Sequence, residues 1–228
     1  LQHRRVISPG FAEEGRLWAF ARGIGLKRLQ HEEYLAMRAG AAVLEADGHG
    51  EKVLRLADQT ILKLFRRKRL LSSAAWSPYA QRFADNAEAL HQRHIPAPGI
   101  IAVWRIPSIG RDAVHYHPVL GKTLREMRRE GLDTASEGGL KAAFTEFVIR
   151  LHEAGVYFRS LHLGNVVYTP DRQFGLIDIS DARIGRRSLS KQLRVRNLRR
   201  LQDIEGERDW VDFSTVMNGA LQGKPRGL

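Results

Sequence analysis

The chain has 228 residues, and its 37 lysines and arginines exceed its 25 aspartates and glutamates, which gives a formal charge of +12. A hydrophobic content of 43% with 27% charged residues is typical of a globular protein and excludes a disordered tail. The chain contains no cysteine, which excludes a disulfide scaffold, thiol catalysis, iron–sulfur clusters and cysteine-ligated zinc.

Hydropathy and charge limit the location and the partners of the protein. No segment reaches the run of about 20 apolar residues that crosses a bilayer. Residues 1–10 include basic side chains but lack the apolar region of a secretory signal, so we expect none there. The positive charge indicates an anionic partner, which is a nucleic acid, a phosphorylated small molecule or an anionic membrane surface.

The first third of the chain changes from a helical to a strand-rich pattern. Within residues 1–40, the segments 17–23 and 32–40 have short apolar faces typical of helices. Residues 41–65 predict three short strands, separated by a glycine turn at Gly48–Gly50 and a polar turn at Ala57–Gln59.

A helix and two further strands are predicted next. Ser77 and Pro78 are typical of an N-cap and a first helical residue, and we expect the helix to run to about His94. Residues 99–106 and 112–120 then predict two strands, which makes a sheet of five.

The second half of the chain is predicted to be mainly helical. Residues 123–131 indicate a short helix, and residues 165–180 indicate a hairpin of two apolar strands. Gly155 is the expected C-terminal cap of a longer helix over residues 140–154. The apolar stripe of that helix has the spacing i, i+4, i+7, i+8 and i+11 and consists of Leu140, Phe144, Phe147, Val148 and Leu151.

The order of these elements predicts the fold class. Strands gather in the first half and helices in the second, which is typical of an α+β protein built from two lobes. We expect an N-terminal lobe over residues 1–112, with leading helices, a sheet and one helix. The helical C-terminal lobe with its small hairpin is expected over residues 113–228.

The most informative segment is 157–181, in which an Asn ends a polar loop and an Asp follows a strand. Phosphotransferases of the protein-kinase fold use such a pair, here Asn165 and Asp178, to bind Mg²⁺ at the nucleotide phosphates. Either residue alone is more often a turn or cap residue, because both types form local hydrogen bonds there. The preceding helix and the intervening hairpin favour the metal-binding interpretation.

This segment resembles the catalytic core of the kinase-like phosphotransferases. Within that group it is similar to the bacterial lipopolysaccharide core (heptose) kinases, the toluene-tolerance-protein-like family and the aminoglycoside-phosphotransferase-like enzymes. These families have a loop of the form H-G-D-L-H-x-G-N, followed by I-D and a further acidic residue. Leu161–Asn165 matches the second half of the loop, and Ile177, Asp178 and Asp181 match the metal motif. The resemblance spans about residues 42–184 and is strongest in its last third.

The resemblance implies a lysine that contacts the nucleotide phosphates and a glutamate that pairs with it. Lys63 lies within an apolar strand, where a charged side chain is costly unless it is paired. Glu88 is the expected partner, because Asp85 is the only other acid on the following helix. The alternative is a lysine that faces outward from an edge strand.

Two other segments have weaker signals for nucleotide binding. Gly48 and Gly50 form a candidate loop over the phosphates, but they also suit an ordinary hairpin turn. Residues 115–124 resemble the hinge at which adenine would bind, and they equally suit a plain strand-to-helix turn.

The catalytic loop departs from the family at its most important position. The families place a catalytic Asp five residues before the Asn, where this chain has Ser160. Three interpretations follow: a catalytically silent pseudokinase, a kinase that uses His162 or Asp181 as its base, or a kinase that relies on positioning and Mg²⁺ alone.

Basic residues form three clusters: residues 66–69, a helix with Arg125, Arg128 and Arg129, and the run from Arg183 to Arg200. In that run a set of leucines predicts an amphipathic helix. The alternative without a functional role is a solvated helix packed on the C-terminal lobe. The resemblance implies ATP and Mg²⁺ as cofactors and a phosphorylated glycolipid or sugar of the lipopolysaccharide core as acceptor.

The same resemblance implies a cytoplasmic protein with peripheral contact at the inner membrane, made by the basic residues. A basic nucleic-acid-binding protein is a further alternative. It is disfavoured because we find no helix-turn-helix, zinc module or aromatic-rich ribonucleoprotein strand in the sequence.

Overall fold

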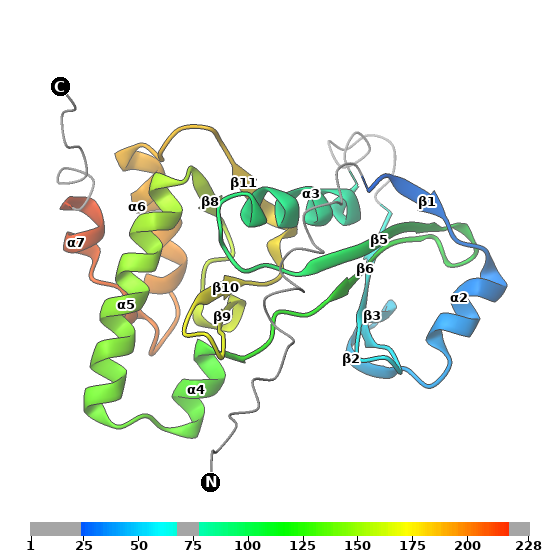
Figure 1. Cartoon of the computed structure of the whole chain (residues 1–228), viewed down its shortest axis with the longest axis horizontal. Helices are drawn as coiled ribbons and strands as arrows, with labels where there is room; N and C mark the ends of the chain where they lie inside the picture. The colour runs from blue at the N-terminus through cyan, green and yellow to red at the C-terminus, as the bar shows by residue number, and fades with distance from the viewer. Residues whose placement is uncertain (1–23, 68–77, 219–228) are drawn as a thin grey trace, which may run out of the picture.

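The computed structural model describes residues 24–67 and 78–218. Its main sheet has six strands in the order β1-β5-β6-β4-β3-β2 (Figure 1). Neighbouring strands are antiparallel except for β1 and β5, which run parallel. The six strands are β1 (Leu26–Arg28), β2 (Ala42–Asp47), β3 (Gly50–Arg55), β4 (Ile61–Arg66), β5 (Gly99–Ile106) and β6 (Arg111–His117).

The first described residues differ from the sequence prediction. A helix does form at α2 (His31–Arg38), but Leu26–Arg28, expected within a helical segment, is the edge strand β1. Three residues are too few for strand alternation to be visible, and this strand is defined by its pairing with β5. The main sheet therefore has six strands instead of five. The expected helix at 17–23 lies outside the described residues.

The strands predicted for residues 41–65 are confirmed as β2, β3 and β4. Lys63 of β4 lies opposite Val53 of β3 and opposite Val114 of β6. Because β4 has a neighbour on each side, the alternative of a lysine on an edge strand is wrong.

Helix α3 (Tyr79–His91) packs against one face of the main sheet. It begins after Pro78, and the predicted N-cap Ser77 lies outside the described residues. The helix contacts β4, β5 and β6, and also the short 3-10 turn η5 (Ile179–Asp181) of the second half of the chain. It therefore connects the sheet to the segment with the predicted metal motif. Its buried residues are Ala80, Phe83, Ala84, Ala87 and Leu90.

The remaining elements are mainly helical, as expected. The predicted hairpin is confirmed as β9 and β10, and β9 also pairs with β7, while β8 pairs with β11. The helices are α4 (Leu124–Glu130), α5 (Thr134–Glu153), α6 (Lys191–Gln202) and α7 (Phe213–Asn218). The strands are β7 (Lys122–Thr123), β8 (Val156–Phe158), β9 (Val166–Tyr168), β10 (Phe174–Leu176) and β11 (Ala182–Ile184). Three further 3-10 turns are η3 (Pro107–Ile109), η4 (Leu163–Asn165) and η6 (Arg208–Trp210).

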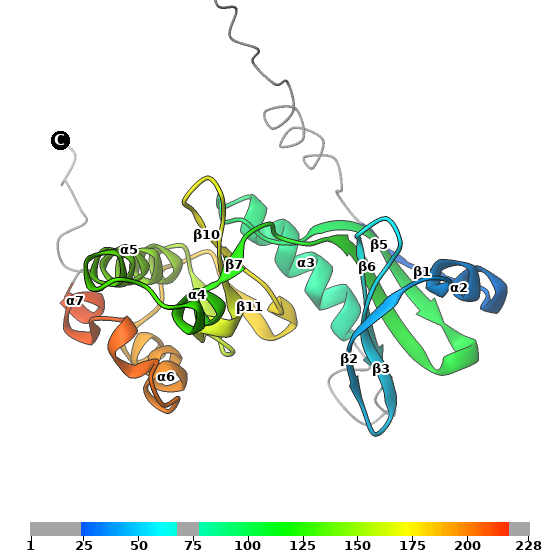
Figure 2. The same cartoon turned by 90° about the horizontal axis from the view of Figure 1, so that it is seen from below.

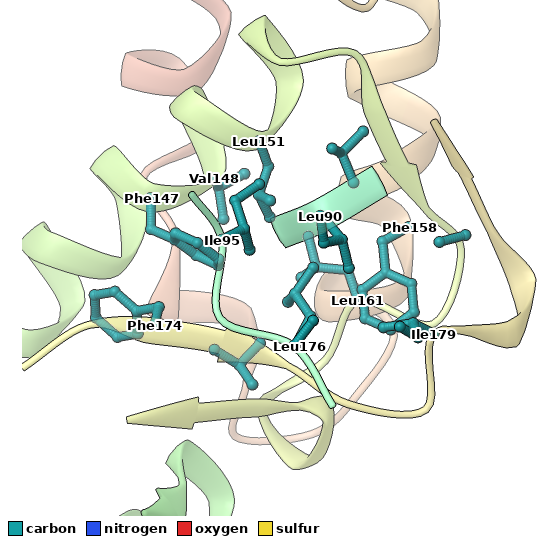
Figure 3. Close-up of a cluster of buried hydrophobic side chains, with 14 of the residues drawn as sticks. Leu90, Ile95, Phe147, Val148, Leu151, Phe158, Leu161, Phe174, Leu176 and Ile179 are labelled. Atoms are coloured by element: carbon teal, nitrogen blue, oxygen red, sulfur yellow. The ribbon is translucent and has the colours of Figure 1, made fainter. Parts of the chain in front are cut away.

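The hydrophobic core has a large and a small cluster. The large cluster joins α3 to α5, β10 and the loop after β8, and Figure 3 shows its centre, where Leu90 of α3 lies among Leu151, Leu161 and Leu176. The predicted stripe on α5 faces this cluster. The small cluster lies between α2 and the opposite face of the sheet and includes Tyr34.

The two kinds of structure gather at opposite ends of the molecule. Figures 1 and 2 show the main sheet at one end, α5, α6 and α7 at the other, and α3 between them. The fold is thus a mixed α+β arrangement. The expected division after residue 112 falls within β6, whose residues as far as His117 belong to the sheet. Among the helices of the described residues, none has the length and apolarity needed to cross a membrane.

Candidate functional site

The centre of the candidate site is an ion pair between the two ends of the molecule. Lys63 Nζ lies 2.6 Å from Asp178 Oδ1, although the two residues are 115 positions apart in the chain. The lysine side chain is 15% exposed, whereas the aspartate is 48% exposed. Lys63 therefore reaches out of the sheet to a carboxylate that is open to solvent.

Asp178 has an unusual backbone conformation. Its φ of 53° and ψ of 43° place it in the left-handed region, which residues other than glycine rarely occupy. Such strain persists only where the surrounding structure maintains it, and it concentrates at functional sites. The preceding residue, Ile177, donates its backbone N–H to the carbonyl of Asn165 at 3.0 Å. That bond holds the two predicted metal ligands on adjacent strand ends.

Asn165 is buried at the end of the loop that follows β8. Its Nδ2 donates to the Ser160 carbonyl at 3.0 Å, so the amide orientation is defined by the loop itself. Among the described residues, its Oδ1 accepts no hydrogen bond. An oriented amide oxygen next to a carboxylate is the kind of donor set that Mg²⁺ accepts beside phosphate oxygens.

The sequence-predicted metal pair therefore fits Mg²⁺ in its chemistry. Asn165 offers one neutral hard oxygen and Asp178 one charged carboxylate. Protein sites for Mg²⁺ at nucleotides use one or two carboxylates and complete the shell with phosphates and water. Asn165 and Asp178 would hold the ion, and Lys63 would then be free to contact a phosphate.

Ser160, at the position where the resemblance implies a catalytic Asp, contacts a carboxylate. Its Oγ donates to Asp181 Oδ2 at 2.6 Å. Arg159 Nε donates to the same oxygen at 3.1 Å, and Asp181 Oδ1 is buried without a hydrogen-bond partner. A carboxylate is thus present beside the loop, supplied from η5 instead of from the loop itself.

His162 is held in the loop by contacts of its ring. Its Nδ1 accepts from the backbone N–H of Gly164 at 3.1 Å and lies 3.3 Å from Arg125 Nη2. Burial lowers the pKa of His162, and the charge of Arg125 lowers it further. His162 Nδ1 caps η4, whereas Asp181 contacts Ser160 directly, so of the two alternative bases Asp181 has the more suitable placement.

Glu207 is a residue of the site that sequence reasoning missed. It is 1% exposed, and it accepts from Arg125 Nη2 at 2.6 Å and from the Leu163 backbone N–H at 2.9 Å. These bonds connect the catalytic-like loop to α4 and to the segment after α6. Nothing in the local sequence marks Glu207, because its partners lie 44 and 82 positions earlier in the chain.

The expected pairing of Lys63 with Glu88 is wrong, because Lys63 pairs with Asp178. Glu88 instead accepts from Gln92 Nε2 at 2.9 Å, one turn along α3. The side of α3 that faces the second half of the chain presents Asn86, which donates to the carbonyls of Ile179 and Ala182. The helix is rotated so that an amide, not a carboxylate, meets η5.

The two weaker motifs lie at connections between elements, which suits both interpretations given for each of them. Gly48 is in the two-residue turn between β2 and β3, and Gly50 has a φ of 105° beside it. Strand β3 of this hairpin pairs with β4, which contains Lys63. In the hinge-like segment 115–124, a Cβ on Gly121 would lie 2.2 Å from the Tyr168 carbonyl oxygen, so close packing against β9 requires that glycine.

The basic clusters differ in their surroundings. Lys68 and Arg69 of the first cluster lie outside the described residues. In the last cluster, the predicted amphipathic helix is confirmed as α6, but Arg194 is 3% exposed and donates to the Leu189 carbonyl. Arg194 therefore stabilises the N-terminal turn of α6 and does not belong to a surface that could contact an anionic partner.

Comparison with protein-family models finds no match for this chain, and comparison with curated proteins finds no matching sequence.

Proposed function

We propose that the protein is an ATP- and Mg²⁺-dependent phosphotransferase with a two-lobed, kinase-like arrangement. The single observation that supports this best is the contact between Lys63 and Asp178 beside Asn165. Lys63 and Asp178 come from distant parts of the chain, a backbone hydrogen bond joins Asn165 to the residue before Asp178, and each of the three side chains has the chemistry that a nucleotide–metal site requires.

Each of these residues has a distinct role in the proposal. Lys63 binds the nucleotide phosphates, and Asn165 and Asp178 hold the metal, which neutralises phosphate charge when bound. Asp181 takes the proton from the hydroxyl group of the acceptor substrate, directly or through the Ser160 hydroxyl that it already binds. Arg159 holds the Asp181 carboxylate in place from the solvent side.

The acceptor and the location are proposed from the resemblance and from charge. A sugar of the lipopolysaccharide core, as a phosphorylated glycolipid, suits a protein of formal charge +12. Such an acceptor is handled at the cytoplasmic face of the inner membrane, where exposed arginines of α6 would contact anionic lipid.

A catalytically silent pseudokinase is the second candidate, and a specific observation favours it. Ser160 and Arg159 both donate hydrogen bonds to Asp181 Oδ2. That oxygen therefore already has two partners within the protein before any acceptor binds. In this alternative the Lys63–Asp178 site binds nucleotide without transferring phosphate.

Nucleotide binding and turnover test these candidates. Thermal shift with ATP should require Mg²⁺, and Lys63→Met should weaken it, whereas Lys27→Met on the exposed edge strand β1 should not. Turnover on purified lipopolysaccharide core then separates the enzyme from the pseudokinase. A protein that shows no Mg²⁺-dependent shift with ATP contradicts both candidates.

A further inference from the structure

An arginine-lined groove lies beside the candidate site. It has a volume of about 870 Å³ and is formed by α3, the loop after β8, the segment around β11 and the start of α6. That volume is in the range of small-molecule sites, which is about 300–1,000 Å³. The cationic side chains that line it are all arginines: Arg82, Arg159, Arg183, Arg186, Arg187 and Arg196.

The charge of the groove is not neutralised by the protein. Asp181 is the only carboxylate among the described residues that line it, and this carboxylate is bound by Arg159. Arg82 lies over the ring of Tyr79, with the guanidinium carbon 5.2 Å from the ring centroid. Among the described residues, Arg183, Arg186, Arg187 and Arg196 form no ion pair. A cleft lined by charges of one sign attracts ligands of the opposite charge, here anions.

The residue type indicates which anion binds. Guanidinium groups bind phosphates and carboxylates through two parallel hydrogen bonds, which makes arginine the preferred residue for recognising these groups. The groove is also concave and therefore suits a discrete molecule better than a flat membrane surface. Leu189, Leu193 and Tyr157 provide less polar walls for the carbon skeleton of such a molecule.

The position of the groove connects it to the proposed reaction. Asp181 lines the groove and also binds Ser160, and it follows Asp178 by three residues in the η5 segment. The nucleotide site and the groove thus meet at η5. An alcohol bound in the groove would present its hydroxyl at the Asp181 carboxylate, next to the phosphates held at Asp178.

We infer that this groove is an acceptor subsite that takes an alcohol already bearing two or more phosphate groups. The assignment of the groove as an acceptor subsite rests on the proposed function, whereas the binding of phosphate groups rests on the arginines alone. The arginines hold the existing phosphates and place a free hydroxyl at Asp181.

Binding of glucose 1,6-bisphosphate without nucleotide tests the groove, with glucose as the neutral control. In isothermal titration the bisphosphate should bind and glucose should not. The triple variant Arg183→Gln, Arg187→Gln, Arg196→Gln should weaken binding by roughly tenfold or more, because it removes charge-assisted hydrogen bonds. The matched variant Arg28→Gln, Arg55→Gln, Arg172→Gln loses the same charge at exposed positions outside the groove and should bind like the parent protein.

The outcomes separate the groove from the function. Bisphosphate binding that is equal in the two triple variants overturns the inference. Loss of binding to anionic phosphatidylglycerol vesicles in the groove variant, with no binding of the bisphosphate, assigns the groove to a membrane and also overturns it. A protein that binds Mg²⁺–ATP but no bisphosphate contradicts the groove alone. A protein that binds the bisphosphate through the three arginines but binds no nucleotide supports the groove and contradicts only the proposed function.

Discussion

The two faces of the main sheet differ in the parts of the molecule that they pack against. The face toward α2 is covered by a small hydrophobic cluster around Tyr34, and its helix is joined to the sheet by an ion pair between Arg38 and Glu51. The face toward α3 belongs to the large cluster, which continues without interruption into the helical end of the molecule. Lys63 projects on this second side, where Phe65 of the same strand stacks on Tyr79 of α3.

The difference explains how distant residues are brought together. On the α3 side, polar contacts cross between the two ends: Asn86 binds the carbonyls of Ile179 and Ala182, and Arg93 binds those of Ala154 and Gly185. On the α2 side, the helix makes polar contacts with its own end of the chain, where Arg38 pairs with Glu51 and His31 Nδ1 lies 3.0 Å from Ser108 Oγ. Helix α3 is therefore the element that aligns Lys63 with Asp178, and α2 stabilises the sheet alone.

The strongest test of this comparison is Asp178→Asn. Asparagine tolerates the left-handed backbone, so the fold should remain, but the lost carboxylate should abolish Mg²⁺-dependent nucleotide binding. Thermal shift with ATP and Mg²⁺ measures the effect. The matched control is Asp171→Asn on the exposed β9–β10 turn, which should bind like the parent protein.

A different result would assign Asp178 a purely structural role. If the residue served only as a cap, Asp178→Asn would leave both the free energy of unfolding and nucleotide affinity nearly unchanged, because asparagine and aspartate are equally good caps. Nucleotide affinity therefore distinguishes the two results, and chemical denaturation of the nucleotide-free protein checks that the variant is folded.

The next largest effect is expected at Asp181, on the acceptor side of η5. Removal of a positioned base typically lowers kcat by about 10²–10⁴-fold, so Asp181→Asn should cost most of the rate with little change in ATP binding. Ser160→Ala should have a mild effect, because the carboxylate remains. Initial rates of phosphate transfer at saturating ATP measure both variants.

Ser160→Asp separates the remaining interpretations. In an enzyme without an effective base, the added carboxylate at the family position should raise turnover. In an enzyme that uses Asp181, two carboxylates in contact would repel each other and the rate should not rise. A fast parent enzyme that Ser160→Ala silences would show instead that the serine itself is essential, contrary to the assignment of the loop.

The parts of the site that the sequence predicted are those with a local pattern. Asn165 and Asp178 are marked by a helix, a loop and a hairpin in succession, and Lys63 is marked by a charge within an apolar strand. Glu207 and Asn86 are not marked, since their partners lie far away in the chain and depend on packing. The same holds for β1, a strand defined only by its neighbour.

Another prediction concerns the helical end of the molecule. His152 on α5 is fully buried, and burial lowers its pKa from 6.5 to about 4. Its Nε2 lies 3.0 Å from Asn197 Oδ1, while its Nδ1 has no partner. Between pH 6.5 and pH 4 the unfolded chain binds a proton at this residue that the folded protein does not. The free energy of unfolding should therefore decrease as the pH is lowered from 6.5 to 4, by about 3 kcal/mol in all.

Chemical denaturation at pH 7 and at pH 4.5 measures this loss of stability. His152→Gln keeps a side chain of similar length that does not titrate, so the pH dependence of the variant should be clearly smaller. His94→Asn, at an exposed position, serves as the control and should keep the pH dependence of the parent protein. Equal pH dependence in the parent protein and in His152→Gln would contradict the assignment to this residue.

The smallest effects test the role of α3 most directly. Asn86→Ala leaves the carbonyls of Ile179 and Ala182 without their donor, which should lower the free energy of unfolding by about 1–3 kcal/mol. Because Asn86 positions η5, we also expect ATP to bind more weakly in this variant. Glu88→Gln removes a charge whose partner is the neighbouring Gln92 on the same helix, so stability should change by no more than about 0.5 kcal/mol. Nucleotide affinity should stay the same in Glu88→Gln. The opposite ranking, with Glu88→Gln the more damaging of the two for ATP binding, would mean that the glutamate pairs with Lys63 once nucleotide binds, and that α3 rotates to bring it there.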